Sequence, residues 1–182
     1  MLLFVILGLA IFISGCISEQ DATSTIKKSS PLQKSASRII VEQVIGDRTD
    51  SAGAVNDSIQ SLIIRIKPDI STTSLDLSEI TITIKDKDNK YDLRFSSTGN
   101  GTGAFSASAV RDEDGSFNSS SPVLNSGDLA TIQINPTAFS SISLPVRKTF
   151  WISLTPDLGK AVNLEIITPN SYGINRFVNL YP

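Results

Sequence analysis

Residues 61–85 read SLIIRIKPDISTTSLDLSEITITIK and contain two runs in which apolar and polar side chains alternate. In the second run every other residue from Ile80 to Ile84 is isoleucine, and the residues between them are threonine. Successive side chains of a β-strand point to opposite faces of the sheet, so this period of two predicts strands with one buried face.

Similar runs recur through the rest of the chain, separated by groups of turn-forming residues. The turn groups are Lys87–Asn89, Gly99–Gly101, Asp114–Gly115 and Ser126–Asp128. Short strands at such spacing, with no convincing helix among them, predict an antiparallel β-sandwich of immunoglobulin-like type or a barrel. The expected strands are Ser61–Lys67, Ile80–Lys85, Tyr91–Phe95, Ala104–Val110, Leu129–Ile134, Phe150–Leu154, Val162–Ile167 and Phe177–Leu180.

The N-terminal segment has a different composition. Met1 to Ser18 reads MLLFVILGLAIFISGCIS and carries no charged residue. As a helix with a rise of about 1.5 Å per residue, it would span roughly 27 Å, close to the thickness of a bilayer core. Its apolar residues would cover all sides of that helix, which predicts burial in lipid or in a bundle of helices.

The segment Leu32–Gly46 (LQKSASRIIVEQVIG) has apolar residues at spacings of three and four, with Gly46 after the last of them. This pattern predicts an amphipathic helix. We therefore expect an α+β chain: an N-terminal hydrophobic α-helix and its amphipathic continuation in residues 1–47, then an antiparallel β-sandwich in residues 48–182.

Composition argues against several classes of function. The 182 residues have a net charge of −2 and contain no histidine and one cysteine. A nucleic-acid-binding surface would need clustered Lys and Arg. Histidine, the commonest catalytic base and metal ligand, is missing from the sequence. We expect a non-enzymatic protein with no cofactor, no nucleic-acid partner and no small-molecule substrate.

Four stretches together give the chain a resemblance to archaellins, the archaeal flagellins. They are LQKSASRIIVEQVIG at 32–46, LIIRIKPDISTTSLDLSEITITI at 62–84, SGDLATIQI at 126–134 and FWISLTPDLGKAVNLEIITP at 150–169. The resemblance implies a structural subunit of an archaeal flagellum, similar to a type IV pilin, for swimming motility and adhesion. It would wait in the membrane and then polymerise into an extracellular, glycosylated cell-surface filament, alone or with other archaellins. The implied filament-core helix residues are Leu2, Leu3, Phe4, Ile6, Leu7, Leu9, Ile11, Phe12 and Ile13.

Two departures from the archaellin pattern keep alternatives open. Archaellins begin with a short basic leader, whereas Met1 here is followed directly by Leu2, and the polar insert Glu19–Pro31 is longer than in the family. Ile13-Ser14-Gly15-Cys16 fits a lipobox, in which Cys16 is lipidated after signal cleavage. The alternatives are therefore a lipid-anchored cell-surface β-sandwich protein and an accessory pilin-like protein.

Smaller motifs predict surface chemistry. Asn56, Asn100 and Asn118 each begin an Asn-x-Ser/Thr triplet and are candidate glycosylation sites. We expect no metal site, although Asp112 and Asp114 could offer oxygens to Ca²⁺; solvated turns explain such loops more simply. The aromatic residues, Trp151 included, are interpreted as core and strand-pairing residues rather than as a ligand platform.

Overall fold

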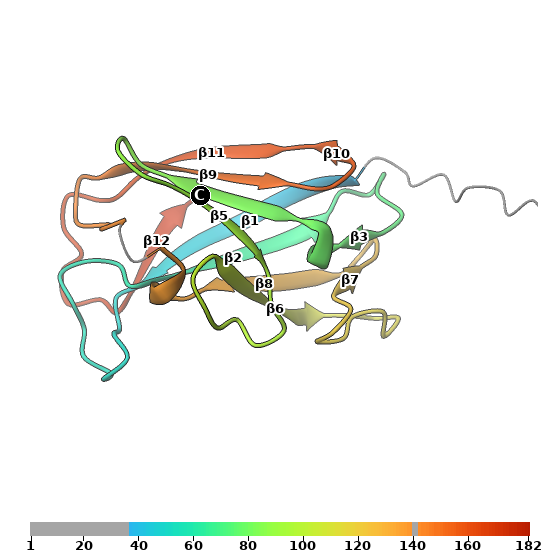
Figure 1. Cartoon of the computed structure of the whole chain (residues 1–182), viewed down its shortest axis with the longest axis horizontal. Coiled ribbons are helices and arrows are strands. Elements are labelled where there is room, and N and C mark those ends of the chain that lie inside the picture. Colours follow the sequence, from blue (N-terminus) through green and yellow to red (C-terminus); the bar gives the residue numbers. More distant parts are fainter. Residues whose placement is uncertain (1–36, 140–141) are drawn as a thin grey trace, which may run out of the picture. The chain divides into compact units, whose positions relative to one another are not determined.

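The computed structural model describes residues 37–139 and 142–182, and this part of the chain is built from β-strands (Figure 1). The expected α+β class is wrong for it, because the helices within the described residues are two short 3₁₀ turns, η1 at Leu77–Glu79 and η2 at Pro136–Phe139. Neither is long and apolar enough to cross a bilayer. The strands are β1 (Ser37–Asp47), β2 (Ser61–Pro68), β3 (Leu75–Asp76), β4 (Thr81–Lys85), β5 (Lys90–Phe95), β6 (Ala104–Arg111), β7 (Val123–Leu124), β8 (Leu129–Ile134), β9 (Thr149–Thr155), β10 (Gly159–Lys160), β11 (Val162–Ile167) and β12 (Phe177–Tyr181).

The eight strands expected from alternation are confirmed. Each begins and ends within one residue of its expected limits. The amphipathic helix expected at Leu32–Gly46 is wrong where the structure describes it, because β1 occupies Ser37–Asp47. A register shift between Val41 and Gln43, typical of a β-bulge, interrupts the alternation of β1. Val41 and Val44 are therefore buried on the same side although they are three positions apart, and this spacing is the same as that of one helix face.

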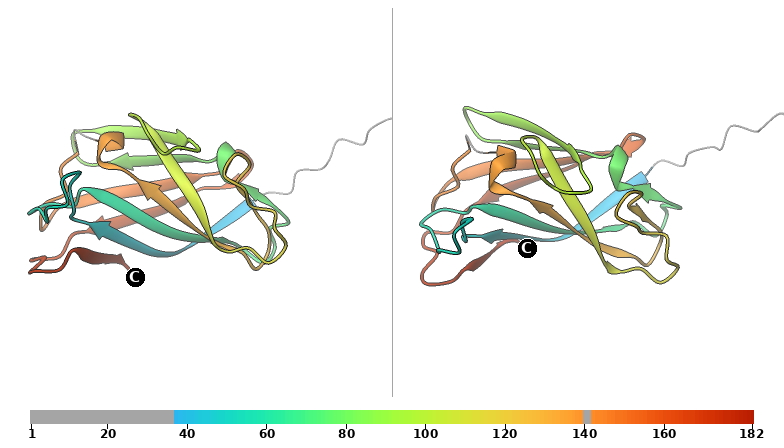
Figure 2. Two further views of the ribbon diagram at one scale, coloured as in Figure 1. Left: turned by 90° about the horizontal axis from the view of Figure 1, so that it is seen from below. Right: turned by 60° about the horizontal axis from the view of Figure 1, so that its bottom comes forward.

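Nine strands form a continuous sheet in the order β10-β1-β2-β8-β6-β5-β4-β9-β11, and β12 also pairs with β1. Short strands β3 and β7 form a separate pair. Most pairings are antiparallel as expected, but β1 with β10 and β5 with β6 are parallel, so the sheet is mixed. Strand β6 pairs with β8 and with β5, and it crosses obliquely between them (yellow-green in Figure 2).

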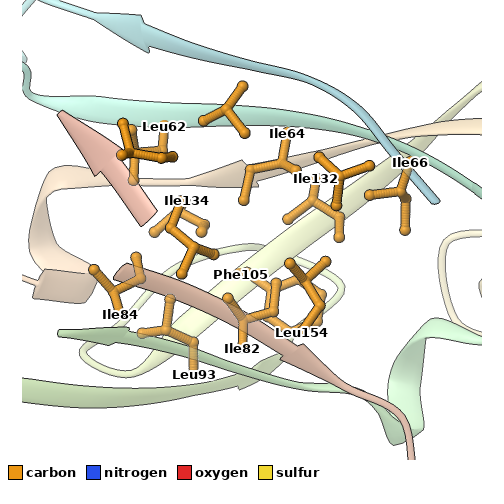
Figure 3. Close-up of a cluster of buried hydrophobic side chains, with 14 of the residues drawn as sticks. Leu62, Ile64, Ile66, Ile82, Ile84, Leu93, Phe105, Ile132, Ile134 and Leu154 are labelled. Carbon is orange, nitrogen blue, oxygen red and sulfur yellow. The ribbon is translucent and has the colours of Figure 1, made fainter. Parts of the chain in front are cut away.

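The core lies between two groups of strands, β1, β2 and β8 on one side and β4, β5 and β9 on the other (Figure 3). Isoleucines and leucines from both groups have no exposed surface. The apolar residue at every second position of these strands therefore faces the core between the two groups. Phe105 of β6 is also fully buried and meets Phe95 edge-on, with ring centroids 5.9 Å apart. The labelled core residues of Figure 3 are Leu62, Ile64, Ile66, Ile82, Ile84, Leu93, Phe105, Ile132, Ile134 and Leu154.

Residues 37–47 belong to the compact unit Lys34–Pro182. The role expected of residues 1–47 as a filament core concerns assembly and stays a prediction.

Candidate functional site

Three aspartates lie close together where strand β6 ends beside the start of strand β8. Asp112 and Asp114 follow β6, and Asp128 precedes β8. Because β6 and β8 are antiparallel neighbours, the end of the first lies beside the start of the second. One carboxylate oxygen from each aspartate lies within 4.8 Å of the others, and together they form the acidic cluster.

Hydrogen bonds from the surrounding loop hold the acidic cluster. The backbone N–H of Ser116 donates to Oδ1 of Asp112 at 3.1 Å and to Oδ1 of Asp114 at 3.0 Å. Buried Asp128 accepts the backbone N–H of Asn125 at 2.7 Å, and the Asn125 side chain donates to Asp114 at 2.7 Å. The hydrogen bonds from Asn125 and then from Ser116 lower the pKa of Asp114 below its ordinary value of 3.8.

The chemistry open to this cluster is that of hard oxygen donors. Carboxylates are the ligands that Ca²⁺ prefers, so Asp112, Asp114 and Asp128 are the described residues that could hold such an ion. Sequence analysis identified Asp112 and Asp114 as candidate metal ligands but missed Asp128, which lies in a turn of ordinary composition. The available signal was that Asp128 directly precedes one strand, β8, while Asp112 directly follows its neighbour β6.

The three glycosylation candidates lie in different surroundings. Asn100 and Asn118 are exposed, and the side-chain carbonyl of Asn118 accepts the Ser120 hydroxyl at 2.9 Å. The side-chain N–H of Asn56 instead donates to Asp50 at 3.0 Å and to the carbonyl of Ala54 at 3.4 Å. Glycan attachment uses that nitrogen, so the structure leaves it accessible at Asn100 and Asn118 and occupied at Asn56.

At the opposite end of the sheet, charged residues fix the loop that precedes β12. Arg176 makes a two-pronged ion pair with buried Asp47, at 3.1 and 2.9 Å. Arg48 is 5% exposed, and its guanidinium donates to the carbonyls of Asn56, Gly173 and Asn175 while it lies 5.2 Å from the Tyr172 ring centroid. Sequence analysis missed this network because Asp47 and Arg48 lie more than one hundred residues from their partners in the loop before β12.

The charged pair predicts how stability depends on pH. Burial alone would raise the pKa of Asp47, but hydrogen bonds from Arg176 and Thr49 outweigh it, and the pKa lies below 3.8. The unfolded chain therefore binds more protons, so this stabilisation is complete above the unfolded pKa and is lost as pH falls through the folded one. We expect the free energy of unfolding, measured by urea titration, to fall as the pH drops below about 4.

The matched variants for this titration are Asp47→Asn and, on an exposed loop, Asp57→Asn. The first should flatten the dependence of the unfolding free energy on pH, and the second should leave it unchanged. An Asp47→Asn protein with the full acid dependence of the parent would contradict the assignment.

The other predicted site residues lie outside the described part of the chain. These are the lipidation candidate Cys16 and the expected filament-core residues Leu2, Leu3, Phe4, Ile6, Leu7, Leu9, Ile11, Phe12 and Ile13.

Comparison with solved structures defines the fold class. The chain is similar to archaeal flagellin FlaB1 from Methanocaldococcus jannaschii, with a TM-score of 0.68 and 21% identity over 80% of this chain and 97% of that one. The subunit of the archaeal flagellum of Methanospirillum hungatei strain JF1 follows, with a TM-score of 0.53 and 14% identity over 81% and 72%. The described domain therefore has the fold found in archaeal filament subunits.

Sequence similarity identifies the family. No protein-family model matches the chain. Flagellin B2 of Methanocaldococcus jannaschii is 31% identical over 173 residues, which are 85% of this chain and 76% of that protein. The chain belongs to the archaeal flagellin family, as its sequence motifs indicated.

Proposed function

We propose that this chain is a structural subunit of an archaeal flagellum filament. The observation that carries the proposal is the 31% identity to Flagellin B2 across most of both chains. The likeness of the β-domain to FlaB1, at a TM-score of 0.68, supports it. The filament serves swimming motility, with adhesion as a second use.

The uncharged segment Met1–Ser18 gives this role a physical basis. Apolar side chains can reside in the membrane before assembly and can then be buried among the same segments of neighbouring subunits, so water is excluded in both states. Repeating one head-to-tail contact that does not close on itself produces an open helical polymer. The partners are therefore further copies of this chain and other archaellins, and the product is an extracellular filament on the cell surface.

The subunit needs no catalytic chemistry in this role, because polymerisation requires only complementary surfaces. The described domain presents several exposed apolar side chains suited to such contacts, since apolar surface is often covered by a partner. At the end that carries Arg176, Ile174 is 98% exposed and Phe177 is 51% exposed. At the end that carries the acidic cluster, Ile70 is 91% exposed.

The test is electron microscopy of material sheared from cells that express the chain, with gold-labelled antibody against residues 37–182. We expect label along the whole length of the filaments. Mass spectrometry of the same material separates the alternatives, because an anchored protein would carry a diacylglyceryl group on Cys16 and would remain with the cell envelope. That result would overturn the filament assignment.

We also expect glycans on Asn100 and Asn118 but not on Asn56, because the Asn56 side-chain nitrogen is already bound by Asp50 and Ala54. Mass spectrometry of peptides from native filaments measures this directly. Replacing Asn118 by Gln should remove one glycan mass and leave the others. Full modification of Asn56 would show that attachment precedes formation of the loop and would contradict the argument from structure.

A further inference from the structure

The outer face of the layer formed by β5, β4, β9 and β11 contains a groove with a volume of about 320 Å³. This volume is at the lower end of the range that small-molecule sites occupy, roughly 300–1,000 Å³. Strands β9 and β11 lie at the top of Figure 1, and β6 and β8, beside which the acidic cluster lies, are lower in that view. We call it the Trp151 groove; its side chains are Thr83, Lys85, Lys90, Trp151, Ser153 and Asn163.

Strand register explains why the face is hollow here. Lys85 is paired with Lys90 on one side and with Trp151 on the other, which forms a row of long side chains. The next outward row places Thr83 beside Ser153, and Ser153 beside Asn163. Outward side chains of a sheet stand roughly perpendicular to it, so the short row forms a floor and the long row forms a wall.

The wall combines an aromatic ring with positive charge. Trp151 is half-buried, and the Lys85 ammonium lies 5.5 Å from its ring centroid. Lys90 is 2.9 Å from Asp92, while the described contact of Lys85 is the indole ring rather than a carboxylate. On its other side Trp151 is paired with exposed Glu165, so the positive charge is confined to the β4–β5 end of the wall, where Lys85 and Lys90 favour the acidic group of a ligand.

The floor supplies directional hydrogen bonds. Ser153 offers a hydroxyl group, and Asn163 offers a side-chain amide that can both donate and accept. The Thr83 hydroxyl donates to Asp92 at 2.6 Å, so toward a ligand Thr83 acts as an acceptor. An indole ring packs well against the C–H face of a sugar, whose hydroxyl groups then meet polar side chains alongside. The six side chains therefore match a flat, hydroxyl-rich ligand that carries a negative charge.

We propose that the Trp151 groove binds an acidic saccharide. Its pyranose ring lies against Trp151, its hydroxyls bond to Thr83, Ser153 and Asn163, and its carboxylate meets Lys85 and Lys90. An extended peptide cannot add as a strand at the floor of the groove between β4 and β9, because each of these strands is paired on both sides and presents no free backbone edge. The site requires the folded β-domain but not polymerisation, so it stands independently of the filament role.

The experiment uses the full-length chain in detergent and trigalacturonate as the probe. Trp151 is the single tryptophan of the chain, so its fluorescence reports directly on the groove. We expect a saturable change in emission with trigalacturonate and at least about tenfold weaker binding of its neutral methyl ester. Absence of any saturable change would overturn the proposal, and so would equally tight binding of an acidic glutamate peptide.

Variants separate the groove from the rest of the surface. Ser153→Ile keeps Trp151 and suits a strand, but it fills the floor and should weaken binding by about tenfold or more. Lys85→Gln should reduce the preference for the acid over its ester. Lys87→Gln, on the adjacent exposed turn, should leave both the affinity and this preference unchanged. Trp151→Phe, followed by calorimetry, should retain part of the affinity. Unchanged binding in Ser153→Ile would place the ligand elsewhere and refute the assignment.

The acidic saccharide could be a glycan on a neighbouring subunit or a polymer from outside the cell. Native filaments distinguish these two sources. If neighbouring glycans fill the groove, filaments bind trigalacturonate only after enzymatic removal of glycans. If the ligand is external, untreated filaments bind it as the detergent-held chain does. Filaments that bind in neither condition while the detergent-held chain does would show that subunit packing covers the groove, which would overturn an exposed role in the filament.

Discussion

Leu7→Asp is expected to abolish entry of the subunit into filaments while leaving the β-domain folded. Leu7 lies in the middle of the uncharged segment Met1–Ser18, which we propose is buried in the membrane before assembly and among neighbouring subunits afterwards. An aspartate costs about 2.5–3.5 kcal/mol at the centre of a membrane-inserted segment, and a polymer repeats that cost in every subunit. The measurement is the number of filaments per cell by electron microscopy, with the subunit quantified by antibody.

The matched control is Thr155→Asp, which places the same charge on an exposed residue of strand β9. It should accumulate normally and assemble, because the new carboxylate faces water. The far-ultraviolet circular dichroism of both variants should match that of the parent. Normal filaments from Leu7→Asp cells would remove the assigned role of the N-terminal segment.

Phe105→Ala is expected to lower the free energy of unfolding of the β-domain by about 3–5 kcal/mol. Phe105 has no exposed surface, and its ring meets Phe95 at an interplanar angle of 67°. It lies on β6, which pairs with both β5 and β8, so the cavity would open where the two groups of strands are joined (Figure 3). Chemical denaturation followed by Trp151 fluorescence gives the value.

Phe177→Ala is the comparison for this core substitution. Phe177 is 51% exposed, and the Arg176 guanidinium lies 4.6 Å from its ring centroid. We expect a loss below about 1 kcal/mol, because little apolar surface would be returned to water. Equal losses in the two variants would mean that the described core does not control stability.

The alternation of apolar with polar residues was sufficient to predict most of the strands. It succeeded at β4 because Ile82 and Ile84 are fully buried while the threonines face outward. It failed at β1, where the bulge after Val41 changes a period of two into a spacing of three. A bulge depends on pairing with another strand, here β2, so it cannot be predicted from the sequence of β1 alone.

The same distinction applies to the surface sites: residues that are neighbours in the sequence could be predicted together, but residues that only strand pairing brings together could not. Asp112 and Asp114 could be named from sequence because they are neighbours in one loop, but Asp128 joins them only through the β6–β8 pairing. Trp151 was interpreted as a core or strand-pairing residue because aromatic side chains usually bury. Its outward direction follows from the phase of β9, in which Ile152 and Leu154 take the buried face.

Strand β1 pairs with the last strand of the chain, since Val44–Asp47 meet Phe177–Tyr181. These partners are separated by more than one hundred residues, so the sheet cannot be completed until Phe177–Tyr181 has left the ribosome. At a synthesis rate of roughly 5–20 residues per second, the early strands would wait several seconds without their final neighbour. The domain is thus built to remain incomplete while it is being made, which is the condition a chain needs if it is to be threaded across a membrane before it folds.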